Sequence, residues 1–187
     1  MDREILERVL KNALKEKAVV YIYNDTAQKD EHYGGFVKLV TKDFVVMQVV
    51  LSDARSSGYL ITRLDTIFRI DSGGHVAKRL ELLYALNGEE HAVFELSAFG
   101  NLFVNVIKMA LQNKIAIAVL LNQDEERETL NGFIRHFADE HVVLEDFDDD
   151  AQSYGEIHFE LAAILDINIG TRDLHNLTLL YERGFLE

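Results

Sequence analysis

The run LEDFDDD at residues 144–150 has the highest density of chemically active side chains, with five carboxylates around Phe147. In an extended segment, alternation places Asp146, Asp148 and Asp150 on one face, where their oxygens could bind Ca²⁺ or Mg²⁺. The run lacks the central glycine and distal glutamate of a dedicated calcium loop. The other interpretation is a solvated strand end that leads into a polar turn. We therefore predict no dedicated metal site and keep the three aspartates as candidate ligands.

The histidines suggest a second kind of chemistry. His136 and His141 flank the turn FADE, and we expect them to face each other across two strands. Together with His158 they could bind a transition metal, but no histidine spacing typical of a zinc site supports this. Half-exposed structural histidines are the other interpretation. The chain also lacks the usual nucleophile and phosphate-loop motifs, so we expect no enzyme and no cofactor.

Basic side chains cluster in the first part of the chain and could contact nucleic acid. Phosphate binding needs several cations without opposing carboxylates. Glutamates at 4, 7 and 16 are interleaved with the helical cations, so a solvated helix face is the other interpretation. The candidate nucleic-acid contacts are Arg8, Lys11, Lys15, Lys17, Lys38 and Lys42.

Composition limits the class of protein. The 187 residues are 48% hydrophobic and 27% charged, and they include no cysteine and no proline. This composition predicts a globular protein without disulfides or cysteine-bound zinc. No apolar run reaches the length of a membrane span, and MDREILERVL is not a secretory signal, so we expect a cytoplasmic protein.

Charge is distributed unevenly between the two halves of the chain. Residues 1–97 contain 13 Lys and Arg against 15 Asp and Glu, a net charge of −2. Residues 98–187 contain 6 against 17, a net charge of −11. The second half should repel phosphate backbones, so nucleic-acid binding is plausible only for the first half.

An internal repeat explains the organisation. The stretch GGFVKLVTKDFVV at 34–46 returns as NGFIRHFADEHVV at 131–143, and a shift of 97 residues aligns 5–84 with 102–181 without a gap. The identical positions are mostly apolar or glycine, as expected for two copies of one fold. We predict a repeat at 1–86, an apolar junction at 87–100 and an acidic repeat at 101–187. We also expect Val93, Phe94, Leu96 and Phe99 to be buried at that junction.

Each copy predicts a helix, five short strands and a second helix. Apolar residues recur at helical spacing from Ile5 and from Leu102, and strands of β-branched residues follow at 18–24 and 115–121. The next strands flank turns near 41–43 and 138–140, and closing helices are predicted at 76–86 and 173–183. The fold class is thus α+β, mainly β.

A helix before five bent strands, with Gly35-Phe36-Val37 and Gly132-Phe133-Ile134 on the second strand, resembles the Sm-like (LSm) family. The resemblance implies two tandem SH3-like barrels. A glycine suits this place because a tight bend leaves no room for a Cβ. The family's uridine-binding Asp and Asn are replaced by Thr41 and Val45 and, in the second copy, by Ala138 and Val142.

The Lys-His pair of the bacterial RNA-chaperone branch is also absent, because Ile61-Thr62 and His158-Phe159 occupy its places. The resemblance therefore implies the fold and pairing of strand edges between barrels, but not the RNA site. We expect a non-enzymatic protein-interaction or scaffolding module of bacterial type that self-associates, for instance as a trimeric pseudo-hexamer. The alternative is an RNA-binding post-transcriptional regulator that uses the first repeat. The apolar strand 47–53 and its charged counterpart 144–150 suggest that charge selects which edges pair.

Overall fold

The computed structural model describes residues 2–25, 29–90, 96–123, 126–148 and 150–185. Within them the fold is α+β, with four α-helices and ten strands, and every strand pairing within a unit is antiparallel. The chain divides into two compact units, Met1–Val93 and Phe94–Glu187. Residues 91–95 of the predicted junction lie outside the described residues.

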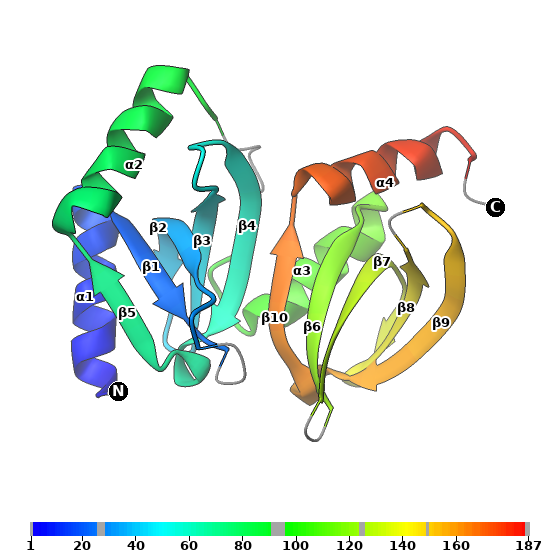
Figure 1. Ribbon diagram of the computed structural model, residues 1–187. Coiled ribbons are helices and arrows are strands. Elements are labelled where there is room, and N and C mark those ends of the chain that lie inside the picture. The colour runs from blue at the N-terminus through cyan, green and yellow to red at the C-terminus, as the bar shows by residue number, and fades with distance from the viewer. Residues whose placement is uncertain (1, 26–28, 91–95, 124–125, 149, 186–187) are drawn as a thin grey trace. The chain divides into compact units, whose positions relative to one another are not determined.

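Unit 1 contains the predicted helix, five strands and closing helix (Figure 1). Helix α1 packs against β2 and β5, and α2 packs against β1. A short 3-10 helix, Leu64–Thr66, separates β4 from β5. The elements are α1 (Arg3–Glu16), β1 (Val19–Tyr23), β2 (Tyr33–Val40), β3 (Phe44–Val50), β4 (Ser56–Arg63), β5 (Arg69–Ser72) and α2 (Gly74–Asn87).

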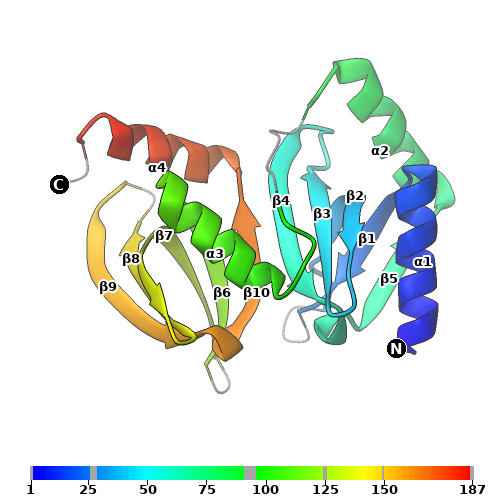
Figure 2. The ribbon, with the colours of Figure 1, turned by 180° about the vertical axis from the view of Figure 1, so that it is seen from behind.

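Unit 2 repeats this order, and Figure 2 shows α3 crossing over the strands of its own sheet. Helices α3 and α4 both contact β7. The elements are α3 (Leu102–Asn113), β6 (Ile117–Gln123), β7 (Glu126–Ala138), β8 (His141–Phe147), β9 (Ser153–Glu160), a 3-10 helix (Leu161–Ala163), β10 (Ile164–Ile169) and α4 (Arg172–Glu182).

The strands of each unit follow the same order. It is β5-β1-β2-β3-β4 in unit 1 and β10-β6-β7-β8-β9 in unit 2. Among the described residues, no ladder joins β5 to β4 or β10 to β9. The predicted closed barrels are therefore wrong, although the α+β class and the five strands per repeat are confirmed. The sheets bend at bulges in the β2–β3 and β7–β8 pairs without closing.

The repeated glycine performs the role predicted for it. Gly35 is paired with Val49, and an added Cβ would lie 2.0 Å from the backbone oxygen of Gln48. Gly132 is paired with Asp146, and its Cβ would lie 1.8 Å from the oxygen of Glu145. Both distances are below any van der Waals contact, so each second strand requires glycine.

Backbone hydrogen bonds also recur at the 97-residue offset. The Leu64 amide donates to Asp43 O at 2.9 Å, and Leu161 donates to Glu140 O at 2.8 Å. Lys17 and Lys114 each end a helix in the left-handed region, both with φ 53°. The two copies therefore share turn and cap geometry as well as sequence.

Each unit buries its own apolar side chains. Unit 1 packs α1 against the inner face of its strands through Leu6, Leu10 and Leu60. Unit 2 buries Phe133, Phe147, Leu174 and Leu177 between its sheet and α4. Because the apolar positions of the two copies coincide, the fold positions the remaining polar side chains in equivalent places.

Two further expectations are wrong. Phe99 was predicted to be buried but is 87% exposed. The contrast between 47–53 and 144–150 was predicted to act at a sheet edge, but β3 lies between β2 and β4, and β8 lies between β7 and β9. Charge on an interior strand cannot select an edge partner. No described helix is long and apolar enough to cross a membrane.

Candidate functional site

Strand β9 is an edge strand of unit 2, with β8 as its one neighbour among the described residues of that unit. The amide of Leu161 donates to Glu140 O, and this bond shows which residues of β9 direct their amides towards β8. Since hydrogen-bonding direction alternates along an antiparallel strand, the amides of Glu156, His158 and Glu160 point away from β8. This row of outward amides can accept another strand.

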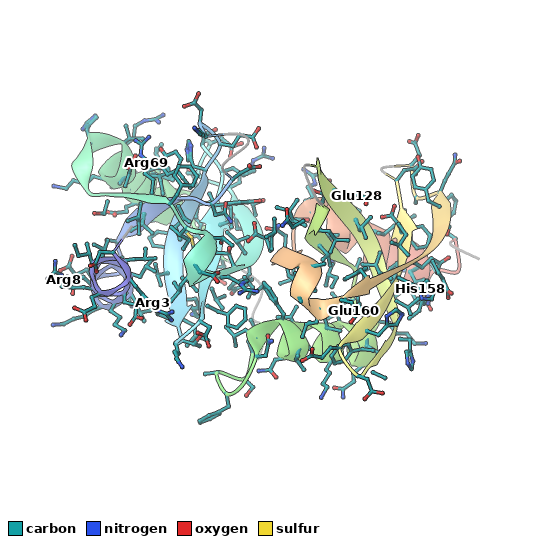
Figure 3. The ribbon with its side chains drawn as sticks, turned by 90° about the horizontal axis from the view of Figure 1, so that it is seen from below. Arg3, Arg8, Arg69, Glu128, His158 and Glu160 are labelled. Carbon is teal, nitrogen blue, oxygen red and sulfur yellow. The ribbon has the colours of Figure 1, made fainter. Side chains whose placement is uncertain are left out.

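Three side chains on the β8–β9 surface form a connected polar cluster, which we call the His–His–Glu cluster (His141, His158 and Glu160). His141 is directly opposite Glu160 in the ladder, and His158 lies diagonally from it. His141 Nε2 is 3.1 Å from His158 Nδ1, and His141 Nδ1 is 3.4 Å from Glu160 Oε1. Figure 3 shows His158 and Glu160 on β9. All three remain accessible, with His141 40% and Glu160 67% exposed.

The predicted pairing of His136 with His141 does not occur in this cluster. The hairpin turn pairs His141 with Ala138, and the same register places His136 opposite Val143. His136 is exposed. Within the described ranges, no group of three or more His, Asp or Glu side chains is arranged so that all of them could bind one metal ion. The structure therefore unites two of the three histidines named as candidate metal ligands.

The three candidate aspartates are not arranged as a metal site. Asp146 accepts the Asn131 amide at 2.8 Å, and Asp148 Oδ1 accepts the amides of Asp150 and Gln152 at 3.0 and 2.8 Å. Alternation ends at Phe147, where β8 ends. Burial raises the pKa of Asp146. These carboxylates shape a turn through backbone hydrogen bonds.

The basic candidates of α1 follow one stripe of the helix. Arg8, Lys11 and Lys15 are exposed at spacings of three and four, and Figure 3 shows Arg8 pointing away from the sheet. Lys11 Nζ is 2.9 Å from Glu7 Oε2, so part of its charge is compensated. The fourth candidate, Lys17, is exposed at the C-cap.

The two remaining cations lie elsewhere on unit 1. Lys38 is exposed on β2, and Lys42 is in the β2–β3 turn, where its carbonyl accepts a hydrogen bond from Arg3. Arg3 begins the 14-residue helix α1, which is roughly 21 Å long. Lys42 is thus about a helix length from Lys17, and the six cations do not form one compact patch.

Exposed apolar side chains on α2 are a feature that the sequence reasoning missed. Val76, Leu82 and Leu86 are 64%, 60% and 72% exposed. Val76 corresponds to Asp173 on α4, and Leu86 corresponds to Arg183, the C-cap of that helix. The sequence could have indicated this surface, because residues that are apolar in the first repeat are charged at the equivalent places of the second.

Comparison with family models, with curated proteins and with solved structures gives no match.

Proposed function

We propose that the chain is a protein-interaction module that associates through the edges of its antiparallel sheets. The single observation that carries this proposal is the eight-residue edge strand β9, with its outward row of amides. An unpaired edge of this length is a ready template for another strand, and strand addition is a common recognition mode. Tyr154, 72% exposed on this strand, adds an aromatic contact residue.

The charges of β9 favour a dissimilar partner strand. Glu156 and Glu160 are exposed on the same face, and pairing of β9 with β9 of a second copy would bring glutamates into opposition. Strand β5 carries balanced charges, because Arg69 Nη2 is 2.6 Å from Asp71 Oδ2. Pairing of β9 with β5 of another copy is head-to-tail, and such contacts generate a ring or a filament. Three copies in a ring would contain six repeats, as the resemblance to Sm-like proteins suggests.

The exposed apolar residues on α2 support an interaction role by a separate route. Isolated exposed apolar side chains are common, but Val76, Leu82 and Leu86 share one helix. A partner that covers this helix would remove apolar surface from water. The equivalent helix of unit 2 is charged at two of these places, so the surface distinguishes the repeats.

Sedimentation velocity over a wide concentration range tests the edge-strand proposal. We expect the wild type to form larger species as concentration rises. Glu156→Pro removes one outward amide without removing a β8–β9 hydrogen bond, and it should shift the distribution to the monomer. Glu156→Ala is the matched control, because it removes the same carboxylate but keeps the amide. A wild-type monomer at every concentration, or equal behaviour of the two variants, rejects self-association through β9.

RNA binding by unit 1 is the second candidate function, and the stripe of Arg8, Lys11 and Lys15 favours it. Fluorescence anisotropy with labelled U-rich and A-rich RNA at low and at physiological salt tests it. Binding through these cations should weaken with salt and be lost in the Lys11→Glu, Lys15→Glu double variant. Lack of binding at low salt, or binding unchanged in the variant, removes this candidate.

A further inference from the structure

The His–His–Glu cluster has a defined pattern of hydrogen-bond donors and acceptors. An ionised carboxylate can only accept, so Glu160 requires the proton of His141 on Nδ1. In neutral His141, Nε2 then carries a lone pair, and this atom faces Nδ1 of His158 at 3.1 Å. His158 must donate its Nδ1 proton to close this contact. The ladder therefore holds a basic imidazole nitrogen at a fixed place on the surface.

The separation of the two nitrogens also suits a shared metal ion. Imidazole nitrogens bound at about 2.0–2.1 Å to one ion lie roughly 2.9 Å apart at a right angle and roughly 3.4 Å apart at the tetrahedral angle. The observed 3.1 Å between His141 Nε2 and His158 Nδ1 falls between these values, and the two accessible rings must turn from their mutual hydrogen bond so that both lone pairs point to one ion. The rings are tilted by 38° with centroids 5.4 Å apart, so they do not stack face to face.

Glu160 occupies the position of an outer-shell carboxylate. Metal-binding histidines commonly donate their second ring N–H to a carboxylate, which fixes the tautomer and raises the basicity of the binding nitrogen. Glu160 makes this contact with His141. The contact is geometrically favoured because non-hydrogen-bonded pairs of an antiparallel ladder bring side chains close together.

We propose that His141 Nε2 and His158 Nδ1 form a two-histidine binding site for a divalent transition-metal ion of the zinc, nickel and copper group, with Glu160 as the orienting residue. Imidazole nitrogen favours these ions over Mg²⁺ and Ca²⁺. Water completes the coordination. On binding, His158 loses its Nδ1 proton to solvent and gains one on Nε2, so both rings remain neutral. The site shares strand β9 with the proposed edge pairing, but metal binding by the two histidines does not require that pairing.

Isothermal titration of tag-free full-length protein with ZnCl₂ and with NiCl₂ tests the site. The wild type should bind one ion saturably, and excess MgCl₂ should not compete. His141→Ala and His158→Ala should each abolish binding. His136→Ala is the matched control, because His136 is an exposed histidine of the same sheet outside the cluster, and it should bind like the wild type. Glu160→Gln should weaken binding about 10- to 100-fold.

A spectroscopic readout separates loss of ligands from loss of folding. Imidazole ¹⁵N shifts of the wild type should report zinc on Nε2 of His141 and on Nδ1 of His158, with no change at His136. Binding that survives either histidine substitution, or equal ¹⁵N shifts at His136, overturns the proposal.

Discussion

The two units place a hydrogen-bond acceptor at the same point of the fold but use different side chains for it. In unit 1 the amide of Val19 donates to Glu81 Oε1 at 2.7 Å. In unit 2 the equivalent amide, Ala116, donates to Thr178 Oγ1 at 3.0 Å. Both acceptors project from the closing helix, 62 residues further along the chain. The geometry of the repeat therefore determines where the acceptor for this amide must lie. The acceptor itself can be either a carboxylate or a hydroxyl.

The contact between the closing helix and the second strand shows the same freedom. Phe36 and Tyr84 pack with ring centroids 5.3 Å apart in unit 1, and Phe133 and Tyr181 pack at 4.5 Å in unit 2. In unit 2 Arg135 joins this pair: it donates to the Tyr181 hydroxyl at 3.1 Å and, from Nε, to Glu145 at 2.7 Å. Unit 1 has Lys38 at the equivalent position. Unit 2 thus adds a polar anchor to a shared aromatic contact.

Substitution of the repeated glycines should have the largest effect and should be alike in the two units. Gly35→Ala and Gly132→Ala each drive a Cβ into a backbone oxygen, so each should lower the free energy of unfolding by about 2–4 kcal/mol. Urea denaturation followed by circular dichroism measures this.

Gly34→Ala is the matched control for the glycine pair. Its Cβ would meet the ring of Tyr21 at 2.6 Å rather than backbone, and a side chain can move aside. We expect a smaller loss than for Gly35→Ala. If Gly35→Ala or Gly132→Ala were tolerated like the control, the two second strands would not share the close approach described above.

Removal of the equivalent tyrosine hydroxyl should affect stability differently in the two units. Tyr181→Phe breaks the hydrogen bond from Arg135, which also lowers the pKa of Tyr181, and should cost about 1–2 kcal/mol. The equivalent substitution in unit 1 is Tyr84→Phe, where Lys38 occupies the position of Arg135, and we expect its cost to be smaller because lysine presents a single ammonium rather than a guanidinium fork. Thermal unfolding of both variants at pH 7 makes the comparison. Equal losses would show that the anchor of Arg135 adds nothing.

Glycine at the helix ends should stabilise both units to a similar, smaller extent. Lys17 and Lys114 adopt a left-handed conformation that costs a side-chain-bearing residue roughly 1–2 kcal/mol. Part of this gain is lost to the greater freedom of glycine in the unfolded chain, so Lys17→Gly and Lys114→Gly should each add up to about 1 kcal/mol. Lys15→Gly, inside α1, should instead destabilise by about as much. The opposite signs are checked by urea midpoints.

Two aspartates should respond to acid in opposite directions, with the smallest effect. The hydrogen bond from Arg69 lowers the pKa of Asp71, so its stabilisation is present at neutral pH and is lost as the pH falls through that lowered pKa. Burial raises the pKa of Asp146, so its ionised form at neutral pH weakens the folded state. Asp71→Asn should therefore lower the melting temperature at pH 7, and Asp146→Asn should raise it slightly. Each change should correspond to no more than about 1 kcal/mol in the free energy of unfolding.

Measurements near pH 2–3 provide the control for the aspartate pair. Both carboxyl groups approach the neutral form there, so each variant should approach the wild type. A difference that persists unchanged at low pH would attribute the effect to packing rather than to charge.

Much of each unit could be predicted from sequence because each helix and strand occurs twice, so that every local pattern could be compared with its copy. Helices near 76–86 and 173–183, the turns at 41–43 and 138–140, and the glycine at Gly35 and Gly132 all follow from local pattern. Closure into a barrel could not be predicted, since it depends on long-range pairing of the first and last strands in the order. The exposure of Phe99 likewise depends on tertiary contacts that composition does not report.

The candidate site was harder to predict than the fold. Alternation indicated which histidines share a face, but the register decides which of them touch. The hairpin turn pairs Ala138 with His141, so His136 lies opposite Val143 rather than opposite the predicted partner. The strand that does meet His141 carries His158, 17 residues later, and the sequence around it gave no metal-site spacing.

The amides of β9 point alternately outward and towards β8, and this alternation should be visible in their deuterium-exchange rates. The outward amides of Glu156, His158 and Glu160 face solvent, whereas those of Ile157, Phe159 and Leu161 are held by β8, so fast and slow exchange should alternate residue by residue. A strand added by any partner would slow the fast set and erase the alternation. Labelling of this one strand would therefore reveal when the edge is occupied, even before the occupant has been identified.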